Sequence, residues 1–329
     1  MIGLKMILVG TCGWSRIYEF LPPSKLSVGE LRAYSEIFKV VEVDSSFYRF
    51  HKAETYRGWR RSVSEDFEFT LKCYRSITHE AMMRPTDEAL RGMERMAEAA
   101  RACGAQVLLL QTPASLRACE ESYESLNTFF ERVVNVRVRL AWETRGSSWE
   151  AGEGLRMLQE ILKRFNLIHV VDPLKMPPAW DADTLYFRLH GLPGYNLEYS
   201  YTNGNLETLL EKIKPLKERR VYIFFNNYAM YRDAYRFQKL LEDGKPPPSP
   251  FGPRSVFWAL KPYEKWPASK TELIERCGRW RCWVAPDRRI LLGEVLKHLE
   301  DRVYEGVEEV LAEAERVWRL TGFPSDVSI

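Results

Sequence analysis

The feature of this 329-residue sequence that most constrains its fold is a regular alternation of strand-like runs with helical stretches over about the first 240 residues. The clearest strand-like run is residues 184–191, in which apolar residues alternate with Tyr186, Arg188 and His190. Alternation with a period of two is typical of a β-strand. In a sheet covered on both faces, a buried arginine or histidine is costly unless it is paired. The end of this strand is therefore a candidate functional site.

The alternation predicts eight strands and seven helices. The expected strands are residues 7–13, 40–48, 67–74, 106–111, 137–143, 167–172, 184–191 and 220–227, and the expected helices are residues 28–38, 53–63, 86–103, 121–133, 154–165, 206–214 and 231–241. Only the sixth strand lacks a following helix, because its connection is short and proline-rich. Such alternation indicates a parallel sheet, and eight units of this total length fit a closed (β/α)8 TIM-type barrel. An open doubly wound sheet is the alternative, but the chain has no GxGxxG or P-loop motif.

The domain boundary expected from the sequence is the proline-rich stretch 245–250, which follows a barrel of residues 1–244. Residues 251–329 then form a small α+β extension, with strands at 256–260 and 280–284 and a long helix or helix pair over 291–320. Four tryptophans lie among an excess of basic residues in its first half: Trp258, Trp266, Trp280 and Trp283. Such a segment can stack on and neutralise single-stranded nucleic acid. The other interpretation, which the short length favours, is that the tryptophans form the core of the extension.

Composition indicates a soluble globular protein, with 45% hydrophobic and 28% charged residues and a net charge of +3. This charge creates no global field that demands nucleic acid. No apolar run is long enough for a membrane span, and the N-terminus lacks a signal-peptide layout. The six cysteines lack metal-ligand spacing, so we expect free thiols and a cytoplasmic location; a Cys277–Cys282 disulfide is the alternative. Abundant Trp, Tyr, Arg and Glu would suit a thermophilic protein.

Polar side chains end nearly every expected strand, and a parallel barrel brings all these ends to one rim. The candidate catalytic residues are Glu42, Asp44, Lys72, Glu143, Arg188 and His190. The candidate substrate-binding residues are Trp14, Tyr48, His79, Gln111, Arg145, Tyr195, Asn226 and Asn227. A structural alternative is a network in which Glu42, Asp44 and Glu143 pair with Lys72 and Arg188. Even such a network would shape a polar pocket.

Seven groups of motifs carry a resemblance to a known family. They are VGTCGW (9–14), VEVDSSFY (41–48), FTLK (69–72) with ITH (77–79), LQTP (110–113), WETR (142–145) with SW (148–149), YFRLHG (186–191) and FFNN (224–227). In this order the chain resembles the YecE-like family, domain of unknown function 72. The resemblance implies a TIM-type barrel over about residues 6–242 and no established biochemical role. Asp44 stands where many members have asparagine, and Cys12 where many have serine.

Three functions are compatible with the rim residues. In the favoured one, Glu42, Asp44, Glu143, Asp172 and His190 hold a divalent cation (Mg²⁺, Mn²⁺ or Zn²⁺), and the protein is a hydrolase that cleaves phosphodiesters of nucleic acid. Lys72 and Arg188 would stabilise the anionic transition state.

The second function needs no metal. Glu42 or Glu143 would act as general acid or base on a sugar or sugar phosphate, held by amide side chains and Arg188. The third is non-enzymatic binding of nucleic acid or a metabolite. We expect no nucleotide cofactor and no membrane partner, and the sequence does not indicate an oligomeric state.

Overall fold

A computed structural model describes residues 6–321 of the chain, which divide into two compact units. The first unit contains residues up to Trp14 together with Tyr34–Leu189 and Glu211–Phe225. The second contains Ser15–Ala33, His190–Leu210 and the residues from Asn226 onward. Each unit is described by itself below. Within the described residues, no helix has the length and apolar character needed to cross a membrane.

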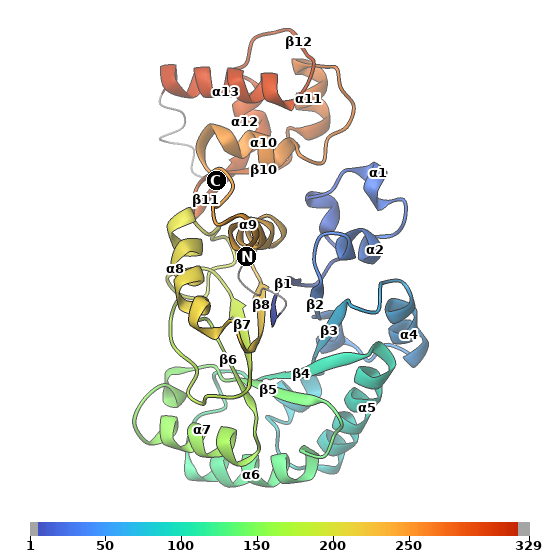
Figure 1. Cartoon of the computed structure of the whole chain (residues 1–329), viewed down its shortest axis with the longest axis vertical. Helices are drawn as coiled ribbons and strands as arrows, with labels where there is room; N and C mark the ends of the chain where they lie inside the picture. The colour runs from blue at the N-terminus through green and yellow to red at the C-terminus, as the bar shows by residue number, and fades with distance from the viewer. Residues whose placement is uncertain (1–5, 322–329) are drawn as a thin grey trace. The chain divides into compact units, whose positions relative to one another are not determined.

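The first unit is a closed barrel of eight parallel strands, as the sequence predicts (Figure 1). The strands are β1 (Ile7–Cys12), β2 (Val40–Val43), β3 (Glu68–Lys72), β4 (Ala105–Gln111), β5 (Arg139–Glu143), β6 (Ile168–Val171), β7 (Thr184–Leu189) and β8 (Arg220–Phe225). Each strand pairs with the next along the chain, and β1 also pairs with β8, which closes the barrel. All eight were expected within a few residues of these bounds. The connection between β6 and β7 contains no helix, again as expected.

Helical segments follow the other strands in the series. They are α2 (Glu30–Ser35), α3 (Ser45–Tyr48), α4 (Ala53–Arg61), η3 (Ser76–Glu80), α5 (Asp87–Cys103), α6 (Glu120–Val133), η4 (Ser147–Trp149), α7 (Gly152–Arg164), α8 (Asn203–Ile213), η5 (Lys214–Leu216) and α9 (Met230–Asp243). Figure 1 shows α4, α5, α6 and α7 on the outside of the strands. Helix α5 has the ends predicted from its sequence. Thr86 accepts a hydrogen bond from the amide of Ala89, and Gly104 ends the helix in the left-handed conformation.

The barrel interior changes character along the strands. Its closely packed part includes Val40, Ala141 and Tyr186, all of them buried. Two residues further along the same strands come Glu42, Glu143 and Arg188. Side chains two apart on a strand share a face, so these charged groups form the next layer of the same interior.

One prediction at the rim was wrong. Residues 45–48 were expected to continue the second strand, but they form the short helix α3. The Ser46 hydroxyl lies 2.7 Å from the carbonyl oxygens of Val43 and Lys72, at the ends of β2 and β3, and shares its single proton between them. The amide of Phe47 also bonds to the carbonyl of Asp44. The chain therefore turns at the end of β2 and positions Asp44 at the turn.

The second unit is built from short elements. Besides α9 and most of α8, it contains η2 (Ile17–Glu19), α1 (Pro23–Leu26), η6 (Gly252–Arg254), α10 (Ser255–Leu260), β9 (Ala268–Ser269), α11 (Lys270–Cys277), β10 (Arg281–Ala285), β11 (Arg288–Leu291), α12 (Leu292–Leu296), β12 (Val303–Tyr304) and α13 (Val307–Thr321). Strands β10 and β11 form an antiparallel hairpin, and β9 pairs with β12.

The structure corrects one element of the extension and resolves another. Residues 256–260, expected as a strand, lie in helix α10, because Val256 and Leu260 are one helical turn apart and both enter the core. The region 291–320 holds the helix pair α12 and α13 rather than one long helix. The expected strand at 280–284 is present as β10. The boundary at residues 245–250 stays a prediction, since the second unit also takes residues from before it.

The core of the extension is mostly aliphatic, and the tryptophans divide between two roles. Trp266 and Trp280 pack partly against that core, whereas Trp258, Trp280 and Trp283 line a pocket. All six cysteines are free, so Cys277 and Cys282 do not form the alternative disulfide.

Candidate active site

Arg188 is the centre of a buried ion-pair network in the barrel. Its Nη2 donates to Oε1 of Glu42 at 2.7 Å, and its Nη1 donates to Oε2 of Glu143 at 2.5 Å and to Gln111 at 3.3 Å. The three charged residues come from β7, β2 and β5. Arg188 and Glu42 are 1% and 0% exposed. Because burial of one charge without a counter-charge is costly, each member depends on the others.

Two further side chains complete this inner layer. The Tyr186 hydroxyl donates to Oε2 of Glu42 at 2.6 Å, so both oxygens of Glu42 are bonded. The Sγ atom of Cys12 lies 3.6 Å from Nη2 of Arg188. All of these side chains are buried. The inner layer is therefore nearly closed to water. Its part in the site is to support and orient the more exposed side chains next to it.

The outer layer consists of partly exposed groups. Asp44 pairs with Nζ of Lys72 at 3.5 Å and with Arg188 at 3.6 Å, and its side chain is 24% exposed. Arg145 pairs with Oε1 of Glu143 at 2.5 Å and is 26% exposed. His79 lies with its ring edge-on to Phe47 at 4.8 Å, and Lys72 stands over the same Phe47 ring. The Phe47 ring therefore contacts both Lys72 and His79.

The electrostatics of the two layers differ. Burial would lower the pKa of Arg188, but Glu143 and Glu42 outweigh burial and hold that pKa well above its ordinary value. Burial raises the pKa of Glu42, an effect that Arg188 partly opposes. Burial, with the nearby cations Lys72, Arg75 and Arg145, lowers the pKa of His79. The histidine is therefore neutral at pH 7 and able to accept a proton.

Among the described residues, one group of three side chains is close enough to hold a metal ion: Cys12, Glu42 and Asp44, whose ligand atoms lie within 4.8 Å of one another. Of the five predicted ligands, this group contains Glu42 and Asp44. It does not contain Glu143, Asp172 or His190. The Nη2 atom of Arg188 contacts all three members, at 3.6, 2.7 and 3.6 Å. Burial and Glu42 also raise the pKa of the Cys12 thiol well above its ordinary value, which disfavours the thiolate. Arg188 would therefore have to move before these three side chains could share a metal ion.

The other predicted residues of the first unit lie outside this network or at its margin. Asp172 pairs with Lys175 at 3.2 Å and accepts a hydrogen bond from the amide of Leu174. Trp14 contacts Trp59 edge-on at 5.1 Å. Tyr48 is 67% exposed, with its ring against Phe47. Gln111 belongs to the network through its bond to Arg188.

Four predicted site residues belong to the second unit: His190, Tyr195, Asn226 and Asn227. The imidazole of His190 stacks on the ring of Tyr195 at 5.0 Å, and its Nδ1 lies 3.3 Å from the Asn226 amide nitrogen. Asn227 donates to the carbonyl oxygen of Tyr199 and to the carboxylate of Asp233. Asn227 is thus engaged in holding the loop that follows β7.

Sequence reasoning missed three residues of the rim site: Tyr186, Cys12 and Phe47. Period-two alternation already places Tyr186 on the same face as Arg188, so Tyr186 could have been found. Cys12 could not, because the strand register that sets it opposite Glu42 is known only from the structure. Phe47 had no signal, because it was expected in a strand and lies in helix α3.

The comparisons with known proteins agree with this fold. The family model for "Protein of unknown function DUF72" matches residues 8–253, which is most of the chain. The chain belongs to the DUF72 family. This confirms the resemblance found in the sequence motifs.

Similar DUF72 proteins include two curated relatives and a solved structure. UPF0759 protein YecE of Escherichia coli (strain K12) is 30% identical over 138 residues, which are 40% of this chain and 48% of YecE. UPF0759 protein YunF of Bacillus subtilis (strain 168) is 37% identical over 73 residues, 22% of this chain and 26% of YunF. The matches thus span about half of YecE and about a quarter of YunF. The crystal structure of a DUF72 family protein from Thermotoga maritima has a TM-score of 0.59 and 26% identity, and covers 72% of this chain and 99% of that protein.

Proposed function

We propose that this protein is a hydrolase that acts, without a metal ion, on a phosphorylated, sugar-like substrate at the barrel rim. The observation that carries the proposal is the exposure and hydrogen bonding of the Asp44 carboxylate. Its carboxylate is partly exposed, and its buried Oδ1 has no hydrogen-bond donor among the described residues. The cations Lys72 and Arg188 stand 3.5 and 3.6 Å from that oxygen, beyond hydrogen-bonding distance. A water or a substrate hydroxyl would supply the missing donor.

Asp44 is a better general base than either glutamate that the sequence suggested. Both glutamates are bound by Arg188, and Glu42 is 0% exposed while Glu143 is 5% exposed. A general base must reach the proton that it removes. Glu42 and Glu143 instead hold Arg188 in place beside Asp44. They are positioning residues in this proposal.

The outer cations give the site its preference for phosphate. Arg145 is partly exposed, and the largely buried Lys72 ends beside the partly exposed Asp44, so both cations flank the carboxylates and can neutralise phosphate oxygens. In the proposed reaction the water oxygen bonds to phosphorus while its proton passes to Asp44. The ester oxygen leaves and takes a proton from the Lys72 ammonium group. Neutral His79 would accept a hydrogen bond from a substrate hydroxyl.

The proposal is tested by release of inorganic phosphate from sugar phosphates and p-nitrophenyl phosphate with EDTA present. Asp44→Asn should lower kcat by about 100-fold or more, since positioned general bases contribute factors of about 10² to 10⁴. The matched control is Asp66→Asn, an exposed carboxylate that also pairs with a lysine, Lys39, at 3.2 Å. The control should keep full activity. Equal rates in wild type and Asp44→Asn would overturn the proposal, as would a folded wild-type protein that binds substrates without turnover.

The second candidate is metal-assisted cleavage of phosphodiesters in nucleic acid, as the sequence first suggested. The grouping of Cys12, Glu42 and Asp44 favours it. It requires Arg188 to leave its three contacts, which costs the inner ion pairs. Cleavage of bis-p-nitrophenyl phosphate or of a labelled oligonucleotide that depends on Mn²⁺, Mg²⁺ or Zn²⁺ and stops with EDTA would replace the first proposal with this one.

A further inference from the structure

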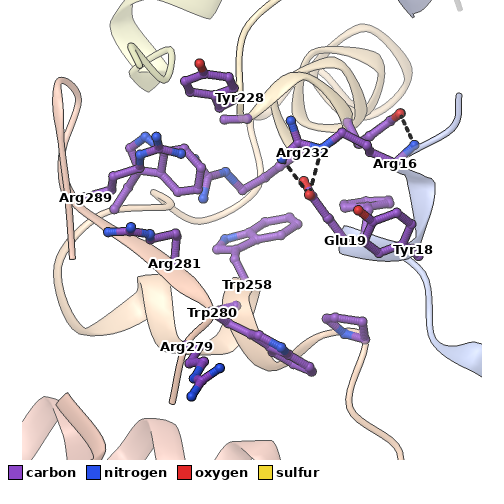
Figure 2. Close-up of a pocket in the computed structure, with 16 residues that line it drawn as sticks. Arg16, Tyr18, Glu19, Tyr228, Arg232, Trp258, Arg279, Trp280, Arg281 and Arg289 are labelled. Atoms are coloured by element: carbon purple, nitrogen blue, oxygen red, sulfur yellow. Dashed lines mark hydrogen bonds and ion pairs between the residues drawn. The ribbon is translucent and has the colours of Figure 1, made fainter. Parts of the chain in front are cut away.

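The second unit contains a pocket of about 320 Å³, large enough for a small ligand. Three separate stretches of the chain line it: residues 16–20 around η2, residues 228–232 at the start of α9, and residues between 258 and 289 in the extension. Figure 2 shows Arg279, Arg281 and Arg289 on one side of the pocket and Tyr18 and Glu19 on the other. No residue of the proposed rim site lines this pocket.

The pocket wall is strongly basic. Five arginines line it and a single carboxylate, Glu19, faces them; the arginines are Arg16, Arg232, Arg279, Arg281 and Arg289. Arg16 pairs with Glu19 and Arg289 with Glu198. Arg279 and Arg281 are exposed, and no ion pair joins either to another residue between 6 and 321. These two guanidinium groups are therefore available to an anion.

Arg232 adds a buried positive charge to the same wall. It is 7% exposed, donates to the Ser200 hydroxyl at 2.7 Å, and has a carboxylate of Asp233 at 3.7 Å. Its Nε has no hydrogen-bond partner within the described part of the chain. Burial lowers the pKa of Arg232 to about 10, so its charge is only partly compensated. An anion in the pocket would reduce that cost.

The wall is also rich in aromatic rings. These are Tyr18, Phe20, Tyr228, Tyr231, Trp258, Trp280 and Trp283. Two of these rings already form cation–π contacts with arginines. The guanidinium of Arg232 lies 4.3 Å from the ring centre of Trp283, and that of Arg289 lies 4.5 Å from the ring centre of Tyr228. Trp280 is partly exposed and lies next to Arg279 and Arg281 in the sequence. An inorganic anion would need no such rings, but a planar base would stack on them.

We propose that this pocket binds a nucleotide of a single-stranded nucleic acid, with the base against Trp280 and the phosphates on Arg279 and Arg281. Stacking requires access to the face of the base, which a strand offers and a duplex does not. A free nucleotide offers the same chemistry, so the experiment must separate the two sources.

The test is fluorescence anisotropy of labelled dT and rU 12-mers against the full-length protein. The affinity of the wild type should fall with added salt, because phosphate neutralisation releases counterions. The double variant Arg279→Gln/Arg281→Gln should bind at least about tenfold more weakly, with a flatter salt dependence. Trp280→Leu should bind about tenfold more weakly, but with the salt dependence of the wild type. This difference separates the contribution of stacking from that of charge.

Two matched controls keep the result specific. Arg276→Gln removes an exposed arginine of α11 that pairs with Glu272 and does not line the pocket. Trp266→Leu removes a tryptophan that packs against the same core as Trp280 but lies outside the pocket. Both should bind like wild type, and urea unfolding should verify that every variant is folded.

Three outcomes would overturn the proposal: no binding by wild type, equal losses in variants and controls, or equal affinity for a duplex. Competition by free UMP or AMP as strong, per molecule, as by the 12-mer would reject the strand and assign the pocket to a free nucleotide. The rim chemistry is measured separately with small phosphate esters, so the two proposals can fail independently.

Discussion

The Nη2 atom of Arg188 lies 2.7 Å from Oε1 of Glu42, between side chains that are 1% and 0% exposed. This contact ties β7 to β2 across the barrel interior. Glu143 binds the other side of the same guanidinium, so one cation serves two buried carboxylates. From this pairing we expect effects on the stability of the barrel and on metal binding at its rim.

Removal of Arg188 should destabilise the barrel severely. Arg188→Met leaves the fully buried Glu42 without its ion-pair partner and leaves Glu143 with Arg145 alone, a change that costs about 3–5 kcal/mol. Arg139→Met is the matched control, because Arg139 is also on a barrel strand and forms a bidentate pair with the exposed Asp183. In Arg139→Met the free energy of unfolding should fall by less than about 1 kcal/mol. Urea unfolding measures both values, and equal losses would show that the buried network contributes no more than a surface pair.

The three-ligand group should bind a metal only when Arg188 is gone. We expect Zn²⁺ or Mn²⁺ to leave the Tm of the wild type unchanged, because the guanidinium contacts all three ligands. In Arg188→Ala the same ions should raise Tm, and adding Glu42→Gln should abolish that rise. Thermal unfolding with and without EDTA measures the effect. A metal-dependent increase in wild-type Tm would contradict this account of the inner layer.

His169 should make the barrel sensitive to acid. Burial lowers its pKa to about 4, against about 6.5 in the unfolded chain. Between these pH values the unfolded state binds more protons, so stability falls as pH decreases from 6.5 to 4, by about 3 kcal/mol in total. His169→Asn keeps an acceptor for the amide of Ala179 and removes the titration. Its unfolding free energy should depend less on pH in this window, whereas that of the exposed-residue control His298→Asn should follow wild type.

Cys119 should be the one thiol that reacts quickly in the native protein. It is exposed at the start of α6, where Ser122 lowers its pKa, whereas the other five cysteines are buried. A thiol reagent such as DTNB should modify one group rapidly in buffer and all six in urea. Cys119→Ser should remove the rapid phase. Two or more rapid thiols in the wild-type protein would contradict the burial of the remaining cysteines.

The position of the rim residues could be predicted because strand geometry fixes it. Alternation with period two places Glu42, Lys72 and Arg188 in the interior, and parallel strands bring their ends together. The choice of partners could not be predicted. Arg188 contacts carboxylates from two other strands and from the turn at Asp44, and those contacts depend on how the closed barrel staggers its strands.

His190 shows a second limit of the sequence. It is two residues from Arg188, yet it belongs to the second unit. Gly191 turns the chain there with a φ of +83°, and a Cβ at that position would lie 1.9 Å from the carbonyl oxygen of Asn196. Only glycine fits such a turn. The sequence marked the end of the strand correctly, but the alternation alone could not show that the chain changes units at that point.

The composition of the second unit has a consequence for synthesis on the ribosome. Its first segment, Ser15–Ala33, is made before the barrel strands that follow it, but the backbone amide and hydroxyl of Ser24 donate hydrogen bonds to the carboxylate of Glu264, 240 residues later. At about 5–20 residues per second, that segment waits roughly 12 to 50 s for its partner. The barrel strands can associate in the meantime. An interrupted or truncated chain would therefore leave a nascent N-terminal segment exposed to chaperones and proteases.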